Sequence, residues 1–160
     1  RSLYALWLEE RGESLDAGRD RSILLNLRVE EALDPDPQVV GEGATVAQLV
    51  EHLAPGTQTH FPVVDRDLRV TGMLEVAEIG RLVRDAAHLA DVVVAADLAH
   101  PVEPLHPRTS LQEAMRRMGT RGVSTLPVTD PETGRLAGIL DRGHLLAAYE
   151  RALAGRGDTD

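Results

Sequence analysis

The chain has 160 residues, 42% of them hydrophobic, which is enough for one or two small cores and excludes a disordered protein. Its 26 acidic and 17 basic residues give a net charge of -9, which argues against nucleic acid as a partner, because phosphate binding needs a basic face. The absence of cysteine excludes disulfides and thiolate metal sites, and it is natural for a reducing compartment.

The first residues of the chain allow two interpretations. Residues 1–8 are apolar and helix-permissive, and Leu3, Leu6 and Trp7 share one helical face. They form either an amphipathic helix that covers the domain or the end of an element that belongs elsewhere, such as a membrane helix. Residues 13–22 are polar and contain glycine, which predicts a linker.

A strand-turn-strand unit occurs twice. His60–Asp65 is an apolar run with Pro-Val that closes on aspartate, and Thr125–Asp130 repeats it 65 positions later. A second strand, which contains a glycine, follows each run. It is Arg69–Leu74 in the first copy and Arg135–Leu140 in the second, 66 positions later. The extra residue lies in the turn, where a hairpin tolerates it best. Such self-similarity indicates a tandem duplication.

The same elements are expected around each hairpin. The first copy spans residues 23–84, with a short helix at 29–33, a strand at 38–40, a helix at 46–53 and a closing helix at 75–84. A linker at 85–93 joins it to the second copy, residues 94–153, and residues 154–160 are expected to be disordered. In the second copy the expected elements are a helix at 92–98, a strand at 101–105, a helix at 111–118, the hairpin and a helix at 141–153.

Capping boxes support the two middle helices. Thr45 and Gln48 form one, and Ser110 and Glu113 form the other at the same offset of 65. Helices segregated against a small, mixed, three-stranded sheet in each copy predict the α+β class, with the copies related by a pseudo-two-fold axis.

The sequence contains few residue patterns that indicate catalysis or metal binding. The six histidines are scattered without metal-ligand spacing. No P-loop, Gly-x-Ser-x-Gly elbow or Gly-x-Gly-x-x-Gly fingerprint occurs. The sequence therefore predicts no metal site and no enzyme.

The order of the elements, the apolar-Pro-Val-x-Asp strand and the glycine strand that leads into a helix resemble tandem CBS domains over residues 23–153. This resemblance implies two sheets docked about the pseudo-two-fold axis and two clefts. Family members often bind adenosine nucleotides there, so the resemblance names ATP, ADP or AMP as the candidate cofactors and makes none of them certain.

A second resemblance lies at the start of the chain. Ser2–Leu8, followed by Arg11-Gly12 and a short linker into the CBS pair, resembles the cytoplasmic tail of a ClC-type chloride channel or chloride/proton antiporter. Residues 1–22 would then be the end of the last membrane helix and a linker, and no other part would enter the membrane. Tyr4 matches a tyrosine whose hydroxyl helps to coordinate chloride in that family; the alternative is a generic residue of an amphipathic helix.

The ClC resemblance implies a cytoplasmic regulatory module that forms a homodimer and acts on the transmembrane part of the same transporter. The alternative is a soluble CBS protein that senses adenine nucleotides and is unrelated to transport. In that protein the first eight residues would be an ordinary domain helix.

In nucleotide-binding CBS pairs the segment after the glycine strand reads Thr/Ser-x-x-Asp, where the hydroxyl meets phosphate and the carboxylate holds ribose. The matching positions are Glu75 and Glu78 in the first copy, and Asp141 and His144 in the second. Neither copy has the family pattern, and a carboxylate in place of the hydroxyl repels phosphate. Asp141 has a simpler alternative role as the N-cap of the last helix, and His144 as an exposed first-turn residue.

The opposite wall of each cleft is the segment before the Pro-Val strand, which contacts the base in the family. We expect nucleotide binding to be weak or lost, and confined at best to the first of two clefts, which has more polar groups. The first cleft consists of Gln58, Thr59, Asp141, Arg142 and His144. The second consists of Val123, Ser124, Glu75 and Glu78.

Overall fold

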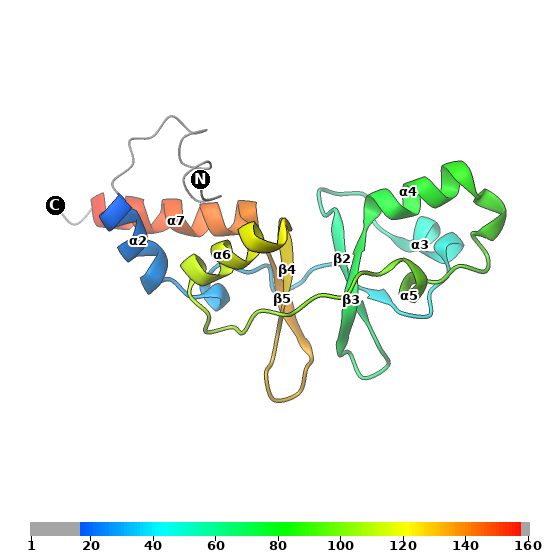
Figure 1. Ribbon diagram of the computed structural model, residues 1–160, viewed down its shortest axis with the longest axis horizontal. Helices are drawn as coiled ribbons and strands as arrows, with labels where there is room; N and C mark the ends of the chain where they lie inside the picture. The colour runs from blue at the N-terminus through cyan, green and yellow to red at the C-terminus, as the bar shows by residue number, and fades with distance from the viewer. Residues whose placement is uncertain (1–16, 158–160) are drawn as a thin grey trace.

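The computed structural model describes residues 17–157 (Figure 1). Residues 1–8, with Tyr4, and the end of the predicted tail at 158–160 lie outside the described residues. The elements in chain order are α2 (Ala17–Asn26), η1 (Val29–Glu31), β1 (Val40–Gly41), α3 (Val46–His52), β2 (His60–Val64), β3 (Val70–Glu75), α4 (Val76–Asp85), η2 (Ala87–Leu89), α5 (Ala95–Leu98), α6 (Leu111–Arg121), β4 (Thr125–Thr129), β5 (Leu136–Asp141) and α7 (Arg142–Gly157).

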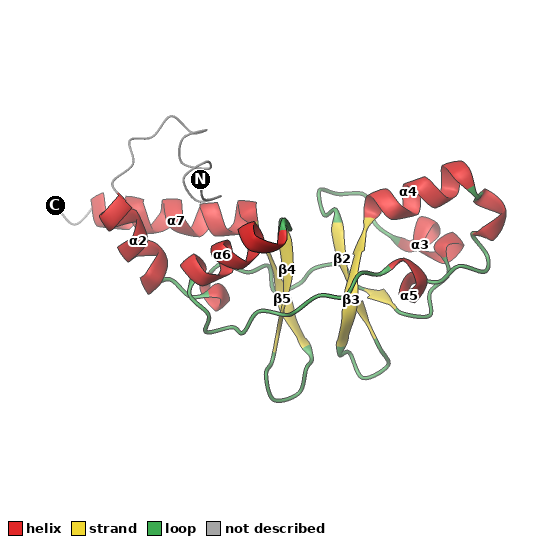
Figure 2. Cartoon of the chain, viewed as in Figure 1, coloured by secondary structure: helices red, strands yellow, loops and turns green. Residues whose placement is uncertain are grey.

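Two hairpins face each other at the centre, and the helices lie on the outer sides (Figure 2). The β2–β3 hairpin has α3, α4 and α5 beside it, and the β4–β5 hairpin has α2, α6 and α7. The hairpins have the same register, with Val63 opposite Gly72 and Val128 opposite Gly138, and each has an irregularity one residue later. The α+β class and the duplication about a pseudo-two-fold axis are confirmed.

The two sheets are not equal in size. The first has three strands in the order β1-β2-β3, with β1 parallel to β2, whereas the second has only β4 and β5. The third strand expected at 101–105 is reduced to a single parallel bridge between Leu105 and Val128. Pro107 stands where the first repeat has Glu42, whose N–H donates to Val64, so the second repeat lacks the donor for the next pairing.

Each copy places its opening segment in the core of the other copy. The α2–η1 segment of the first copy packs into the second core, and α5 of the second copy packs into the first. The second core contains Ile23, Leu24, Val29, Ala32, Leu105, Leu111, Ala114, Met115, Met118, Leu126, Val128, Leu140, Leu145, Ala148 and Tyr149. The first contains Val40, Val46, Leu49, Phe61, Val63, Leu74, Ile79 and Ala95. The two repeats therefore cannot separate without opening both cores.

The glycine of each second hairpin strand permits this exchange. Asp34 exchanges two backbone hydrogen bonds, of 2.8 and 3.0 Å, with the residue that follows Gly138. His100 does the same with the residue that follows Gly72, at 2.8 and 3.0 Å. A Cβ on Gly138 would lie 2.2 Å from the Asp34 carbonyl oxygen, and one on Gly72 would lie 2.8 Å from that of His100. No larger residue fits at either position.

The linker predicted at 13–22 is wrong for its described part, because α2 already begins at Ala17. Asp20 is only 6% exposed, and its carboxyl group accepts a hydrogen bond from the Tyr149 hydroxyl on α7. The predicted disordered tail is also wrong in part, since α7 continues to Gly157. α2 gains its stability from tertiary packing, since Ile23 and Leu24 are buried in the second core.

Smaller differences concern the short elements. The predicted helix at 29–33 is the 3₁₀ turn η1, and the predicted strand at 38–40 pairs only from Val40 to Gly41. The expected helix at 92–98 is α5, which begins at Ala95. No helix among residues 17–157 is both long and apolar enough to cross a bilayer.

One of the two capping boxes is complete. The Gln48 side chain accepts from the Thr45 N–H at 2.9 Å, and the Thr45 hydroxyl accepts from the Gln48 N–H at 3.1 Å. Ser110 accepts from the Glu113 N–H at 3.1 Å, but the Glu113 carboxylate is bound by Arg116 instead. That hydrogen bond lowers the pKa of Glu113 below its usual value.

Candidate functional site

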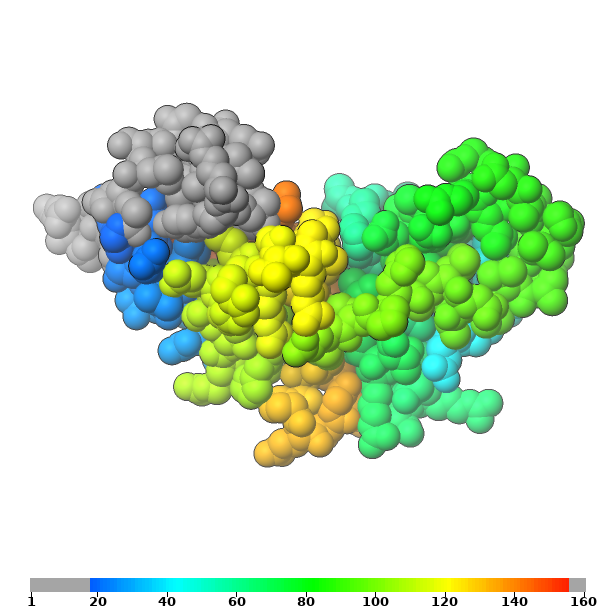
Figure 3. Space-filling model, in the orientation of Figure 1, coloured from blue at the N-terminus to red at the C-terminus, as the bar shows by residue number. Residues whose placement is uncertain are grey.

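The candidate residues gather where two helices begin. α4 follows β3 directly and α7 follows β5 directly, so both helices start at the same edge of the paired hairpins (Figure 1). The surface is notched between the two repeats at this edge (Figure 3). First turns of helices expose backbone N–H groups, which favour anions and hydrogen-bond acceptors.

Asp141 is the N-cap of α7, as its alternative role predicts. Its Oδ1 accepts the His144 N–H at 2.7 Å, and the His144 Nδ1 lies 3.1 Å from the same oxygen. The side chain of Asp141 is 40% exposed and that of His144 is 34% exposed. Within residues 17–157 the Asp141 Oδ2 accepts no hydrogen bond, so this oxygen remains available to a hydroxyl group of a ligand.

The first turn of α4 is different. Glu75 occupies the N-cap position without a side-chain capping bond, and its Oε1 lies 3.8 Å from the His60 Nε2 on β2. Glu78 pairs with Arg81 at 3.4 Å. Two carboxylates in one first turn oppose the approach of phosphate. The first copy therefore offers a poorer phosphate site than the second.

Gln58 has a structural role that sequence reasoning missed. Its Oε1 accepts the Gln38 N–H at 2.9 Å, and its Nε2 donates to the carbonyls of Gln38 (2.8 Å) and His60 (3.0 Å). Gln38 in turn binds the backbone of Ala54 in both directions, at 2.8 and 3.3 Å. The signal for this arrangement is Pro55, which ends α3 early and leaves backbone groups that need new partners.

The walls of the clefts are joined to the helix starts of their own copies. The Thr59 carbonyl accepts the Val76 N–H at 2.8 Å, and the Ser124 carbonyl accepts the Arg142 N–H at 3.2 Å. The Thr59 hydroxyl is 2.9 Å from the His60 Nδ1. The predicted grouping of Gln58 and Thr59 with the start of α7, across the two copies, stays a prediction.

The second predicted cleft has fewer polar groups. Val123 donates its N–H to the Met118 carbonyl at 3.0 Å, directly after Gly122, which ends α6 in the left-handed conformation at φ 66°. Its side chain packs against the second core rather than facing a ligand. Among the residues that the structure describes, no three His, Asp or Glu side chains are placed to hold a metal ion.

The family model of the CBS domain matches residues 29–85 and 92–151. Homoserine O-acetyltransferase from Methanohalophilus mahii is 27% identical over 119 residues, which cover 74% of this chain and 24% of that protein. The chain thus spans about a quarter of the length of the curated relatives it matches.

Two of the similar solved structures were determined with an adenine nucleotide. CBSX2 in complex with AMP has 25% identity and a TM-score of 0.68, covering 79% of this chain and 98% of that chain. The CBS domain of the bacterial CNNM/CorC family Mg²⁺ transporter in complex with ATP has 16% identity and a TM-score of 0.68, covering 82% of this chain and 93% of that chain. The second likeness concerns the fold alone.

Proposed function

Because the chain belongs to the CBS-domain family and carries two CBS domains, we propose that it is a non-catalytic regulatory module of a larger protein. Its cleft at the start of α7 takes an adenine nucleoside or nucleotide, and α2 passes the bound state to the residues before it. The chain matches about a quarter of the length of its curated relatives, and this supports its attachment to other domains.

One observation carries this proposal: α2 packs on the helix that begins at the cleft. α2 lies against α6 and α7, and the Tyr149 hydroxyl of α7 donates to the buried Asp20 of α2. Asp141 caps the start of the same α7 helix by accepting the His144 N–H, and it lies about two helical turns before Tyr149. A shift of α7 upon ligand binding would therefore act on α2 directly.

The polar groups favour the cleft at Asp141 over the one at Glu75. The Asp141 Oδ2 would accept from a ribose hydroxyl, and the guanidinium of Arg142, the next residue in the chain, would attract a phosphate. The two carboxylates of the α4 first turn oppose phosphate. AMP in CBSX2 and ATP in the CNNM/CorC domain support adenosine chemistry as the ligand class.

For the parent protein we propose a ClC-type chloride channel or chloride/proton antiporter, with this module on the cytoplasmic side of the membrane. The support is the resemblance of residues 2–12, with Tyr4 in the chloride position, and the occurrence of a CBS domain in another transporter family. The module would act as a homodimer; α4 offers a partly apolar face for it, because Val76 and Val83 are 43% and 41% exposed. A monomer at high concentration in sedimentation would count against the dimer.

The second candidate is a soluble nucleotide-sensing CBS pair unrelated to transport. CBSX2 favours it, since this chain covers 98% of that solved chain. Deletion of residues 1–12 separates the two. A transporter segment is dispensable for folding, whereas a domain helix with Trp7 in the core would cost several kcal/mol when deleted.

Amide hydrogen exchange with and without millimolar adenosine or AMP tests the coupling. The proposal predicts slower exchange in both the first turn of α7 and the whole of α2. Tyr149→Phe should keep the protection at α7 and reduce it at α2. Protection at α7 with no change at α2 in the unaltered protein would contradict the transmission role while leaving ligand binding intact.

A further inference from the structure

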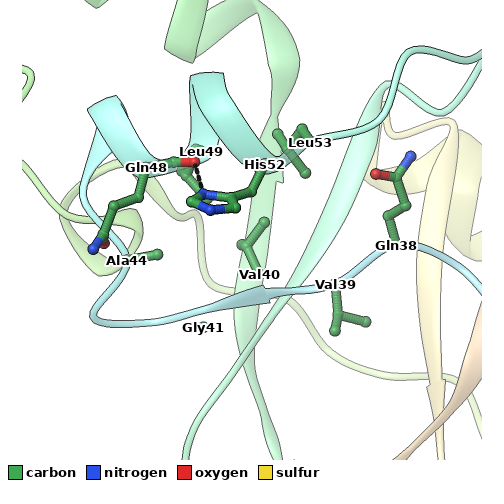
Figure 4. Close-up of a pocket in the computed structure, with 9 residues that line it drawn as sticks. All are labelled: Gln38, Val39, Val40, Gly41, Ala44, Gln48, Leu49, His52 and Leu53. Carbon is green, nitrogen blue, oxygen red and sulfur yellow. Dashed lines mark hydrogen bonds between the residues drawn. The ribbon is translucent and has the colours of Figure 1, made fainter.

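A groove lies between β1 and α3 of the first repeat, separate from the helix starts described above (Figure 4). Its volume is about 390 Å³. Apolar residues form most of it, Gln38 and Gln48 lie at its two ends, and His52 lies between α3 and β1 (Figure 4). The lining residues are Gln38, Val39, Val40, Gly41, Ala44, Gln48, Leu49, His52 and Leu53.

β1 is an edge strand, and Val39, Val40 and Gly41 line this groove. β1 binds β2 through Val40, opposite Val63, and through the Glu42 N–H, which donates to Val64 at 2.9 Å. Because alternate residues of a strand direct their backbone groups to opposite sides, Val39 and Gly41 direct theirs away from β2. Within residues 17–157 the N–H and C=O of Val39 and the N–H of Gly41 have no hydrogen-bond partner.

The second repeat has the same edge, but there it is closed. Pro104 stands where the first repeat has Val39, so no N–H is present. The Pro104 carbonyl accepts from the Arg117 guanidinium at 3.3 Å, and Arg117 is held by Glu103 at 3.7 Å and Glu113 at 3.8 Å. Proline and charged side chains are the usual means by which proteins protect a sheet edge.

His52 stands where the second repeat has Arg117, and it does not close the first edge. Its Nδ1 lies 2.7 Å from the Gln48 carbonyl of its own helix, as the dashed line in Figure 4 shows. The side chain is therefore turned back onto α3. The edge of β1 is therefore open in the first repeat, whereas the equivalent edge at Pro104 in the second repeat is closed.

We propose that the β1–α3 groove binds an extended peptide segment of a partner protein, which adds to β1 as a further strand. Val39 and Gly41 would then make up to three main-chain hydrogen bonds, and alternate side chains of the peptide would face the apolar wall of α3. This site goes beyond the proposed function, because it requires no nucleotide.

The charges beside the groove define the peptide further. No Lys or Arg lines the groove, and the exposed charged residues next in sequence to lining residues, Glu42 and Glu51, are acidic. The partner segment therefore carries Arg or Lys on both sides of a short β-branched run. A second copy of this chain is disfavoured, since it would bring these carboxylates together.

The first test uses the whole chain, labelled with ¹⁵N, and the blocked peptide acetyl-Arg-Val-Thr-Val-Thr-Val-Arg-amide. We expect the largest amide shifts at Val39 and Gly41. Two control peptides are N-methylated at alternate residues, so each keeps the same side chains and charges. Only the control whose methyl groups face β1 should lose affinity, by at least tenfold. Equal affinity of both controls, shifts confined to another surface, or no shifts at 1 mM peptide would each overturn the proposal.

The second test closes and opens the edges by mutation. His52→Arg reproduces the arrangement of Arg117 and should weaken the peptide at least tenfold, as should Val39→Pro. His106→Arg adds the same charge on the other repeat and should leave the affinity unchanged. Pro104→Val with Arg117→His should create a second set of shifts around Leu105. Unchanged binding to folded His52→Arg, or no second site in the folded double variant, would contradict the account.

Discussion

The hydroxyl of Tyr149 on α7 donates a hydrogen bond to the carboxyl group of Asp20 on α2, which lies 129 positions earlier in the chain. Asp20 is 6% exposed and Tyr149 is 3% exposed. This pair is a polar contact between α7, the helix that begins at the cleft, and α2. It fixes the orientation of α2 more precisely than apolar packing alone.

Tyr149→Phe should lower the free energy of unfolding by about 1–3 kcal/mol, because it removes a buried hydrogen bond and adds no new volume. Urea unfolding of both proteins measures this loss. Leu25→Ala on the exposed side of α2 is the control, since Leu25 is 47% exposed and should change stability by less than about 0.5 kcal/mol. Equal effects of the two substitutions would show that the pair does not hold α2.

The glycine contacts between the repeats give a graded prediction. A Cβ at Gly138 would lie 2.2 Å from a backbone oxygen, and one at Gly72 would lie 2.8 Å from the equivalent oxygen. Gly138→Ala should therefore cost about 3 kcal/mol or more, and Gly72→Ala about 1–3 kcal/mol, as overpacking against backbone usually does. Gly43→Ala, where no atom lies within 4 Å, is the control in the same thermal unfolding series. A reversed order would contradict the described approach of the chains.

The hairpin turns differ at one position in backbone strain. Leu68 has φ 64°, and Gly134, 66 positions later, has φ 74°. A left-handed leucine costs roughly 1–2 kcal/mol, whereas glycine is free of that strain but loses roughly 0.5–1 kcal/mol of chain entropy. Leu68→Gly should thus be neutral or stabilise by up to about 1 kcal/mol, and Gly134→Ala should destabilise by about 1 kcal/mol. Calorimetry on both variants checks the signs, and a strongly destabilised Leu68→Gly would disprove the strain.

Gln58 should matter for stability rather than for base recognition. Gln58→Ala removes three hydrogen bonds to backbone and should cost about 2 kcal/mol, with faster proteolysis between Leu53 and Thr59. Thr59→Ala removes only the contact of an exposed hydroxyl with His60 and should cost less than about 0.5 kcal/mol. A Gln58→Ala protein of unchanged stability but lost ligand affinity would restore the role that the family resemblance implies.

The duplicated hairpins were predictable because their signals are local. The Pro-Val strand, the glycine that follows and the capping residue of each middle helix all lie within a few residues of the structure they specify. β2 begins at His60 and β4 at Thr125, as the sequence predicts. The cap at Asp141 was predictable for the same reason, since an N-cap bonds within its own first turn.

The remaining features depend on distant partners. α2 has a polar start that resembles a linker, and only burial against α7 explains why Asp20 lies inside. The exchange of opening segments between repeats leaves no local pattern, because the partner backbone of Gly138 lies about a hundred positions away. The sequence alone suggests that Gln58 is a cleft residue, because it does not reveal the hydrogen bonds between Gln58 and Gln38, which lies 20 positions earlier.

The central claim, an adenosine-type ligand held at Asp141, is tested most directly by thermal unfolding of the whole chain with millimolar adenosine, AMP, ADP and ATP. At ten times its dissociation constant a ligand adds about 1.4 kcal/mol, which raises the melting temperature by about 3–6 °C at this size. Asp141→Ser keeps an N-cap and removes the carboxylate, so it should abolish the ligand-induced shift, whereas Glu75→Gln should retain it. No shift with any of the four ligands, or a shift that survives Asp141→Ser, would contradict the account.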